Sequence, residues 1–314
     1  MTPARSRLLA ALVALLALGA GLGTAALGAA GVLDARGSGD APFASASASS
    51  SAWTASATAA PTTAPTTAAT QPPETLRPRR QPRHQQHHPA PLAGKVVVID
   101  PGHQLGNGAH PSEINRPVDA GGFDKPCNTT GTSTNDGYPE ATFAWEVALR
   151  LREELEALGA TVELTRNSNS EDAWGPCVDA RGRAGNPGEP GPTADVKLSI
   201  HGDGTYTAGA HGFHVIAPGD LPGYTDDIEA DSLDLAHVVR DALVHGGFAV
   251  STYTGTDGID VRTDLGTLNL ADMPTVMVEL GNMRDAGDAA EMESSSGQDA
   301  YADALAAGIS AYLR

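Results

Sequence analysis

Residues 95–103 read KVVVIDPGH, and this stretch decides the fold. Its four consecutive β-branched residues favour an extended strand. The absence of polar alternation is typical of a strand buried on both faces, as in a parallel sheet. The turn at Pro101 and Gly102 ends the strand and leaves His103 just beyond its carboxyl end. We therefore expect a central parallel strand that ends at a histidine.

The elements that follow alternate between strands and helices. After a long polar loop, a helix is predicted from Pro139 to just before Gly159. Its apolar face is formed by Phe143, Val147, Leu151, Leu155 and Leu158. Further strands are predicted at residues 161–165, 195–200, 212–217, shortly before Thr256 and at 275–280, and further helices at 235–243 and 301–312. This alternation predicts the α/β class, with a mostly parallel twisted central sheet flanked by helices in a single globular domain.

The first 92 residues differ in composition from the rest. Arg5 and Arg7 precede an uncharged run rich in Leu and Ala, which predicts an export signal at residues 1–33, either cleaved or kept as an uncleaved anchor. Residues 34–92 are dominated by Ala, Ser, Thr and Pro without periodic apolar residues, which predicts a disordered linker. We therefore expect an exported protein whose globular domain begins at residue 93.

Charge also divides the chain at Leu92. The arm before this point holds seven of the 20 basic residues and three of the 38 acidic ones, so residues 93–314 carry 13 basic and 35 acidic residues. Such an acidic domain excludes nucleic acid as a partner, because phosphate binding needs clustered Lys and Arg. The basic end of the arm, residues 77–88, is interpreted either as a solvated run or as a contact for anionic polymers or a membrane surface. The domain is expected to be a monomer.

The sequence contains two cysteines, Cys127 and Cys177, and both lie in stretches rich in Gly, Pro and Asn. In an exported chain this favours a disulfide. Closing a loop of about 50 residues would stabilise the fold by about 4 kcal/mol. The alternative is a pair of free buried thiols, and the spacing matches no zinc-finger pattern.

Polar residues lie at the carboxyl ends of three predicted strands. His103 follows the first strand, His201 ends a middle strand, and Glu279 closes the last. Ligands gather beyond the carboxyl ends of the strands in such sheets. Glu140 joins this group by inference, because it lies in the first turn of the helix that follows the long loop. We therefore expect the four side chains to converge.

Two imidazoles and one carboxylate are a sufficient ligand set for catalytic zinc, which keeps a fourth position for water. A further carboxylate would take a proton from that water and return it to a departing amine. Spacing alone leaves this open, because the sequence lacks a compact HExxH motif and contains ten histidines. Each residue also has an alternative that involves no metal. His103 would cap a turn, His201 would be an ordinary strand-end histidine, and Glu140 would interact favourably with the dipole of its helix. Glu279, in an apolar strand, is costly unless it is functional or paired.

Four motifs in one order resemble those of a known family. They are VVVIDPGHQLG at residues 96–106, NDGYPE at 135–140, KLSIHGD at 197–203 and VMVELGNMRD at 276–285. This order resembles the zinc-dependent N-acetylmuramoyl-L-alanine amidases, and the likeness covers residues 95–313. The stretch CNTTGTSTNDGYPE at residues 127–140, taken with Cys177, is similar to the actinobacterial single-domain branch that carries a disulfide.

The resemblance implies roles for these residues. His103, Glu140 and His201 would ligate one Zn²⁺, and Glu279 would be the catalytic acid and base. The implied activity is hydrolysis of the amide bond between N-acetylmuramic acid and L-alanine of peptidoglycan, in cell-wall remodelling or cell separation. The enzyme would be secreted or cell-wall associated, or anchored to the membrane by its signal sequence. The family often has SIHAN where residues 199–203 read SIHGD, so the loop beside the metal is expected to differ in shape.

Other polar residues of the motifs carry weaker expectations. Arg262 lies where the family has an arginine near the cleft, so it either contacts substrate or is an ordinary surface charge. Asn282 either orients substrate or holds its loop. Asp100 either hydrogen-bonds behind the metal site or caps the turn. His211 and His214 are three residues apart in a predicted strand, so they face opposite sides and are interpreted as surface or cleft residues.

Two other functions stay open at the level of sequence. One is a wall-binding protein that keeps the fold without catalysis, although all four polar positions are present. The other is a zinc peptidase of different specificity, such as a carboxypeptidase acting on stem peptides. The products separate them, because an amidase frees intact stem peptides, a peptidase frees an amino acid and a binder frees nothing. In each case peptidoglycan is the expected partner, and the basic end of the arm is either solvated or in contact with anionic wall polymers or a membrane surface.

Overall fold

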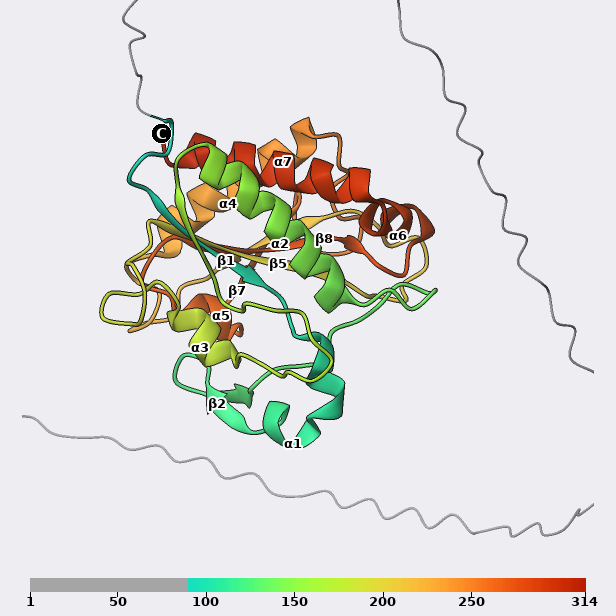
Figure 1. Ribbon diagram of the computed structural model, residues 1–314, viewed down its shortest axis with the longest axis horizontal. Helices are drawn as coiled ribbons and strands as arrows, with labels where there is room; N and C mark the ends of the chain where they lie inside the picture. The colour runs from blue at the N-terminus through green and yellow to red at the C-terminus, as the bar shows by residue number, and fades with distance from the viewer. Residues whose placement is uncertain (1–89) are drawn as a thin grey trace, which may run out of the picture. The chain divides into compact units, whose positions relative to one another are not determined.

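The computed structural model describes residues 90–314 (Figure 1). The predicted export signal and all but the last residues of the predicted linker lie outside the described residues. Among the helices of the described part, none is long and apolar enough to cross a membrane.

A six-stranded sheet forms the centre of the domain, in the order β4-β1-β5-β8-β6-β7. The strands are β1 (Val96–Pro101), β4 (Thr161–Leu164), β5 (Val196–Asp203), β6 (His214–Pro218), β7 (Ile259–Arg262) and β8 (Thr275–Asn282). Strands β4, β1, β5 and β8 pair in parallel, β6 pairs antiparallel to β8, and β7 is parallel to β6. The prediction of a mostly parallel central sheet that contains the KVVVID strand is therefore confirmed.

Helices cover both faces of the sheet (Figure 1). One face packs against α2 (Glu140–Ala157), α4 (Glu229–His245) and α7 (Ser295–Tyr312). The other face carries the shorter α3 (Val178–Arg183) and α5 (Gly266–Asn269), while α6 (Ala286–Glu293) contacts β8 and α7. The face with the short helices is the thinner cover, and the polar side chains of the strands lie on it.

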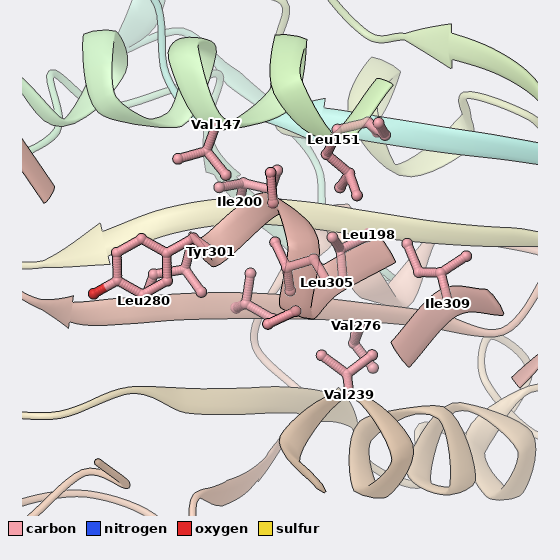
Figure 2. Close-up of a cluster of buried hydrophobic side chains, with 14 of the residues drawn as sticks. Val147, Leu151, Leu198, Ile200, Val239, Val276, Leu280, Tyr301, Leu305 and Ile309 are labelled. Atoms are coloured by element: carbon pink, nitrogen blue, oxygen red, sulfur yellow. The ribbon is translucent and has the colours of Figure 1, made fainter. Parts of the chain in front are cut away.

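The core lies between the sheet and the three long helices (Figure 2). Leu198 and Ile200 of β5 pack there with Val147 of α2 and Leu305 of α7, and all four side chains are fully buried. Because side chains alternate along a strand, Lys197 and the other polar members of β5 face the opposite layer. The alternation predicted for this strand is therefore present, and it separates the core from the polar face.

The segment before Thr256 differs from its prediction. The predicted strand is absent there, and β7 begins three residues after Thr256, while Val250 makes only an isolated bridge to Phe213. The chain turns between these points, with positive φ at Gly255, at Asp257 (50°) and at Gly258. Residues in that conformation break a ladder, so the strand forms only after the turn.

The long loop of residues 104–137 contains short elements of its own. They are η1 (Leu105–Ala109), α1 (Pro111–Ile114) and a hairpin of β2 (Pro117–Asp119) and β3 (Asp124–Pro126). Cys127 follows this hairpin directly and forms a disulfide with Cys177, the residue before α3. The predicted disulfide is confirmed, and it ties the loop to the layer of short helices.

Candidate active site

Three polar side chains from three elements meet beyond the end of β1. His103 follows β1, Glu140 is the first residue of α2, and His201 lies in β5. His103 Nε2 is 3.0 Å from Glu140 Oε1, and His201 Nδ1 is 2.9 Å from the same oxygen. The ligand atoms of the three residues all lie within 4.8 Å of one another. The structure therefore brings together the three side chains that the sequence singled out as ligands.

His103 has an unusual backbone conformation, and its hydrogen bond at Nδ1 leaves Nε2 facing Glu140. Its φ of 55° lies in the left-handed region, which non-glycine residues rarely adopt outside functional sites. Its Nδ1 is 3.1 Å from the Thr129 carbonyl oxygen, which only accepts, so Nδ1 is the donor. Burial alone would lower the pKa of this imidazole, but the charge and hydrogen bond of Glu140 outweigh burial and raise it. Nε2 is the nitrogen that faces Glu140, so it is the atom that a metal ion between the two side chains would bind.

Glu140 is a buried carboxylate with several partners. The backbone N–H of Thr132 donates to its Oε2 at 2.8 Å, and that of Gly202 donates to its Oε1 at 3.3 Å. Burial by itself would raise the pKa of this carboxyl, but the charges and hydrogen bonds of His103 and His201 outweigh it and hold the pKa well below the ordinary value. Glu140 is therefore an ionised carboxylate.

The close approach of these groups depends on small neighbours. A Cβ at Gly102 would lie 2.5 Å from the His201 ring, so only glycine fits there. Gly131 has a φ of +76°, and a Cβ on it would come within 2.9 Å of Glu140 Oε2. These two glycines bring the backbone against the ligand side chains and keep them in place.

The donor set fits a zinc ion. Nε2 of His103 lies 3.0 Å from Oε1 of Glu140, and two such atoms need either the proton of an imidazolium or a cation between them. His201 Nδ1 approaches the same oxygen, and burial lowers the pKa of this imidazole, which favours its neutral form. Two imidazoles and one carboxylate are the ligands of open catalytic zinc sites.

Glu279 lies beside this cluster in a contrasting environment. It pairs across the sheet with His201 of β5 and with His214 of β6. Its Oε2 is buried without a hydrogen-bond partner in the described part of the chain. Burial, followed by the charges of Glu140 and Asp203, raises the pKa of its carboxyl well above the ordinary value. Glu279 lines the same cleft as the three ligands, a space of about 450 Å³.

Buried arginines behind the cluster were not predicted. Arg181 of α3 donates to Asp100 Oδ1 at 2.6 Å, to the Pro101 carbonyl at 2.7 Å and to the His103 carbonyl at 2.5 Å. Arg166 donates to the carbonyls of Pro101 at 3.0 Å and Ala141 at 2.7 Å. The two side chains therefore bind the turn that carries His103 from two sides, and Arg166 also reaches the residue after Glu140.

Asp100 lies beneath this turn and is fully buried. Burial would raise the pKa of its carboxyl, but Arg181 and hydrogen bonds from Ser199 and Thr165 hold it below the usual range. Its partners are these three side chains, and no hydrogen bond links its carboxylate directly to the imidazoles of the described cluster. Its ion pair with Arg181 therefore lies behind the turn that carries His103.

The remaining predicted residues lie around the cleft. Arg262 forms an ion pair with Asp264 at 2.8 Å and lines a second cavity with Glu279. Asn282 is 1 % exposed and donates to the carbonyls of Thr205 at 3.0 Å and Ala210 at 2.8 Å, so its contacts are those of a residue that holds its loop. Substrate contacts of Arg262 and Asn282 stay predictions.

Comparisons with known proteins agree with this geometry. Residues 97–311 match the family model described as N-acetylmuramoyl-L-alanine amidase. The chain is 44 % identical over 226 residues to the N-acetylmuramoyl-L-alanine amidase Rv3717 of Mycobacterium tuberculosis, covering 72 % of this chain and 89 % of that protein.

Solved structures of similar proteins extend the comparison. The amidase Ami1 of Mycobacterium smegmatis is 39 % identical with a TM-score of 0.64, and the match covers 71 % of this chain and 98 % of that one. Ami1 of Mycobacterium abscessus is 43 % identical with a TM-score of 0.64, over 71 % of this chain and 100 % of that one.

Proposed function

The chain belongs to the N-acetylmuramoyl-L-alanine amidase family and is a peptidoglycan hydrolase, and we propose that it acts with a zinc ion held by His103, Glu140 and His201. The bond it cleaves joins N-acetylmuramic acid to the L-alanine of the stem peptide. One observation carries the proposal of zinc: two imidazole nitrogens converge on one carboxylate oxygen of Glu140, at 3.0 and 2.9 Å. Beside them lies Glu279, whose buried Oε2 has no hydrogen-bond partner among residues 90–314.

The chain's own residues divide the work of hydrolysis. Zinc at this site would polarise the lactyl carbonyl and make water acidic enough to attack at neutral pH. The raised pKa of Glu279 supports a role in proton transfer, because a carboxylate that takes up a proton more readily than an ordinary one is suited to accept a proton and return it. Glu279 takes the proton of the attacking water as the new C–O bond forms. It returns that proton to the nitrogen as the C–N bond breaks, leaving a muramic acid carboxylate and a free peptide amine.

On the ligand side of the cleft, hydrogen bonds hold the side chains of His103 and Glu140 in fixed orientations. Thr129 fixes the tautomer of His103 through its carbonyl oxygen, and the backbone N–H groups of Thr132 and Gly202 fix the carboxylate of Glu140. Groups held in this way need little rearrangement during the reaction, which favours catalysis.

The location of the enzyme is also part of the proposal. Peptidoglycan lies outside the cytoplasm, and we propose that residues 1–33 direct export, with retention at the cell wall or membrane. The disulfide between Cys127 and Cys177 supports this, because such bonds persist in oxidising compartments. Cell-wall remodelling or cell separation is the proposed biological role.

Digestion of purified peptidoglycan tests the function. We expect mass spectrometry to detect intact stem peptides with a free L-alanine amine, and we expect chelation to stop their release and added Zn²⁺ to restore it. Release of single amino acids would assign a peptidase instead. Intact stem peptides released equally by the chelated enzyme would remove zinc from the proposal, and the absence of any product from folded, zinc-loaded protein would leave a wall-binding protein.

A further inference from the structure

A separate cavity of about 340 Å³ lies on the face of the sheet that carries the short helices. Its walls come from the end of β2, from the end of α3 and the segment after it, from the loop before α4, and from the end of α5. None of the residues that line it also lines the cleft of the metal ligands. The proposed hydrolysis therefore gives this cavity no role.

Asn269, the last residue of α5, brings an unpaired acceptor to this cavity. Its side chain is fully buried, and its Nδ2 donates to the carbonyls of Ala120 at 2.8 Å and Thr263 at 2.9 Å. Because these two bonds use both N–H groups of the amide, they fix which way the amide points. Its Oδ1 is then left without a hydrogen-bond partner among residues 90–314. A buried acceptor without a donor costs stability, so a ligand that donates a hydrogen bond would be favoured here.

The donors that line the cavity are already engaged by the fold. Arg183 donates to Asp179 at 2.7 Å and lies 3.8 Å from Glu189 Oε1. The side chain of Asn186 donates to the Leu270 carbonyl at 2.9 Å and accepts from a backbone N–H at 2.9 Å. These side chains therefore hold the wall together and leave the recognition of a ligand to the acceptors.

The acceptors at the rim carry negative charge. Asp119 and Asp272 are both exposed and line the cavity. Asp119 uses Oδ1 to accept from the backbone N–H groups of Gly121 and Gly122, at 3.1 and 3.0 Å, which leaves its other oxygen for a ligand. In the described part of the chain, no ion pair engages the Asp272 carboxylate. Two carboxylates above a buried amide oxygen favour a ligand that is both cationic and a hydrogen-bond donor.

The walls suit an organic cation better than a metal ion. Among residues 90–314, the His, Cys, Asp and Glu side chains close enough to hold a metal together are His103, Glu140 and His201, so the carboxylates of this cavity form no chelating group. Tyr224 adds an aromatic wall, and its ring lies against the β2–β3 turn, because a Cβ on Gly122 would come within 3.0 Å of its hydroxyl. Guanidinium groups stack on such rings.

We propose that this cavity binds the guanidinium group of an arginine side chain in a partner polypeptide, with Asn269 Oδ1 at its buried end and Asp119 and Asp272 at its rim. A guanidinium carries five N–H donors in one plane, so it can meet several separated acceptors at once. The site is separate from the catalytic cleft and gives the domain a second surface for recognition.

Titration of the full chain with two small probes tests the proposal. N-acetyl-arginine amide carries the guanidinium, and N-acetyl-citrulline amide is its uncharged counterpart of nearly the same shape. We expect the arginine probe to shift the NMR signals of the Asn269 side-chain amide, and we expect the citrulline probe to bind about 10-fold more weakly, as for the loss of a hydrogen bond to a charged group. Equal affinities for the two probes would overturn the proposal.

Two variants locate the binding. Asp272→Asn should raise the Kd of the arginine probe about 2–5-fold, as for the loss of one exposed ion pair. Asp234→Asn, an exposed residue of α4, is the matched control and should leave the Kd unchanged. Asn269→Leu removes the buried acceptor and should raise the Kd about 2–10-fold, with thermal unfolding as the check on its fold. An unchanged Kd in Asp272→Asn and in folded Asn269→Leu would place the probe elsewhere and overturn the proposal.

Discussion

Glu140 and Glu279 are two carboxylates of one cleft, and their surroundings shift the pKa values of the two groups in opposite directions. Glu140 meets two imidazoles and two backbone N–H groups, and its pKa is held low. Glu279 has a buried oxygen without a partner in the described chain, and its pKa is raised by burial and by neighbouring carboxylates. The residue type is the same, so the difference comes from position in the fold.

We propose that this difference sets the roles of the two residues. A carboxylate that is ionised and fixed by several donors is suited to bind a cation. A carboxyl with a raised pKa and a free oxygen is suited to exchange protons with a reacting group. The ligand side of the cleft is therefore the rigid side, built on β1, α2 and the two buried arginines, and the β8 side is the reactive side.

Removal of the charge of Glu140 should have the largest effect. Glu140→Gln replaces the carboxylate that both imidazoles approach with a neutral amide. Changes to residues that only orient the ligands typically lower metal affinity by roughly 10–100-fold, and we expect a larger fall here. Hydrolysis should be lost with the metal. Competition with a chromophoric chelator measures the affinity, and Glu153→Gln, an exposed residue of the same helix, is the control. Retention of zinc by Glu140→Gln would contradict the role of Glu140 as a metal ligand.

Loss of the arginine fork behind His103 should have a smaller effect. Arg181→Lys keeps a positive charge but cannot bind Asp100 and the carbonyls of Pro101 and His103 together. We expect zinc affinity to fall about 10–100-fold, the typical result of disturbing the residues that orient a ligand. Arg183→Lys is the matched control, because Arg183 lies on the same helix and binds only surface carboxylates. Equal affinities in the two variants would show that Arg181 does not position the turn.

Lys197 offers a pH-dependent test of the same rigid side. It is fully buried, donates to the Gly182 carbonyl of α3, and burial lowers its pKa from 10.5 to about 7. Between pH 7 and pH 10.5 the unfolded chain therefore binds a proton that the folded chain does not. Stability should rise with pH in this window by up to about 1.4 kcal/mol per pH unit from this group.

The Lys197→Met variant isolates that contribution. Urea unfolding at pH 7, 8 and 9 gives the free energy of unfolding of both proteins, and the shared effects of pH cancel in the difference. We expect the advantage of the methionine variant to shrink as the pH rises. A difference that stays constant across these pH values would mean that the folded lysine keeps its proton.

The parts of the fold that sequence predicts well are those with local patterns. The β-branched run of β1, the helical spacing of α2 and the apolar runs of β5 and β8 each appear within a few residues, and they placed His103, Glu140, His201 and Glu279 correctly in the fold. Pairing of the two cysteines also followed from their number and setting.

The parts that sequence misses depend on contacts between distant segments. Arg166 and Arg181 bind mostly backbone carbonyls, which every residue has, so their burial leaves no sequence signal. The same holds for Thr129, which fixes His103 through its carbonyl oxygen. The strand expected before Thr256 is absent for a local reason. The chain turns at residues 255–258, so the strand of this region, β7, begins only after that turn.

The most direct test of the central claim is to measure zinc content and turnover on one preparation of Glu279→Gln. In the proposed division of roles, Glu279 transfers protons and does not bind the metal. We therefore expect the variant to keep the zinc content of the unsubstituted protein and to lose about 10²–10⁴-fold in turnover. A loss of zinc in proportion to the loss of turnover, or full turnover without the carboxylate, would contradict the division of roles between the two carboxylates.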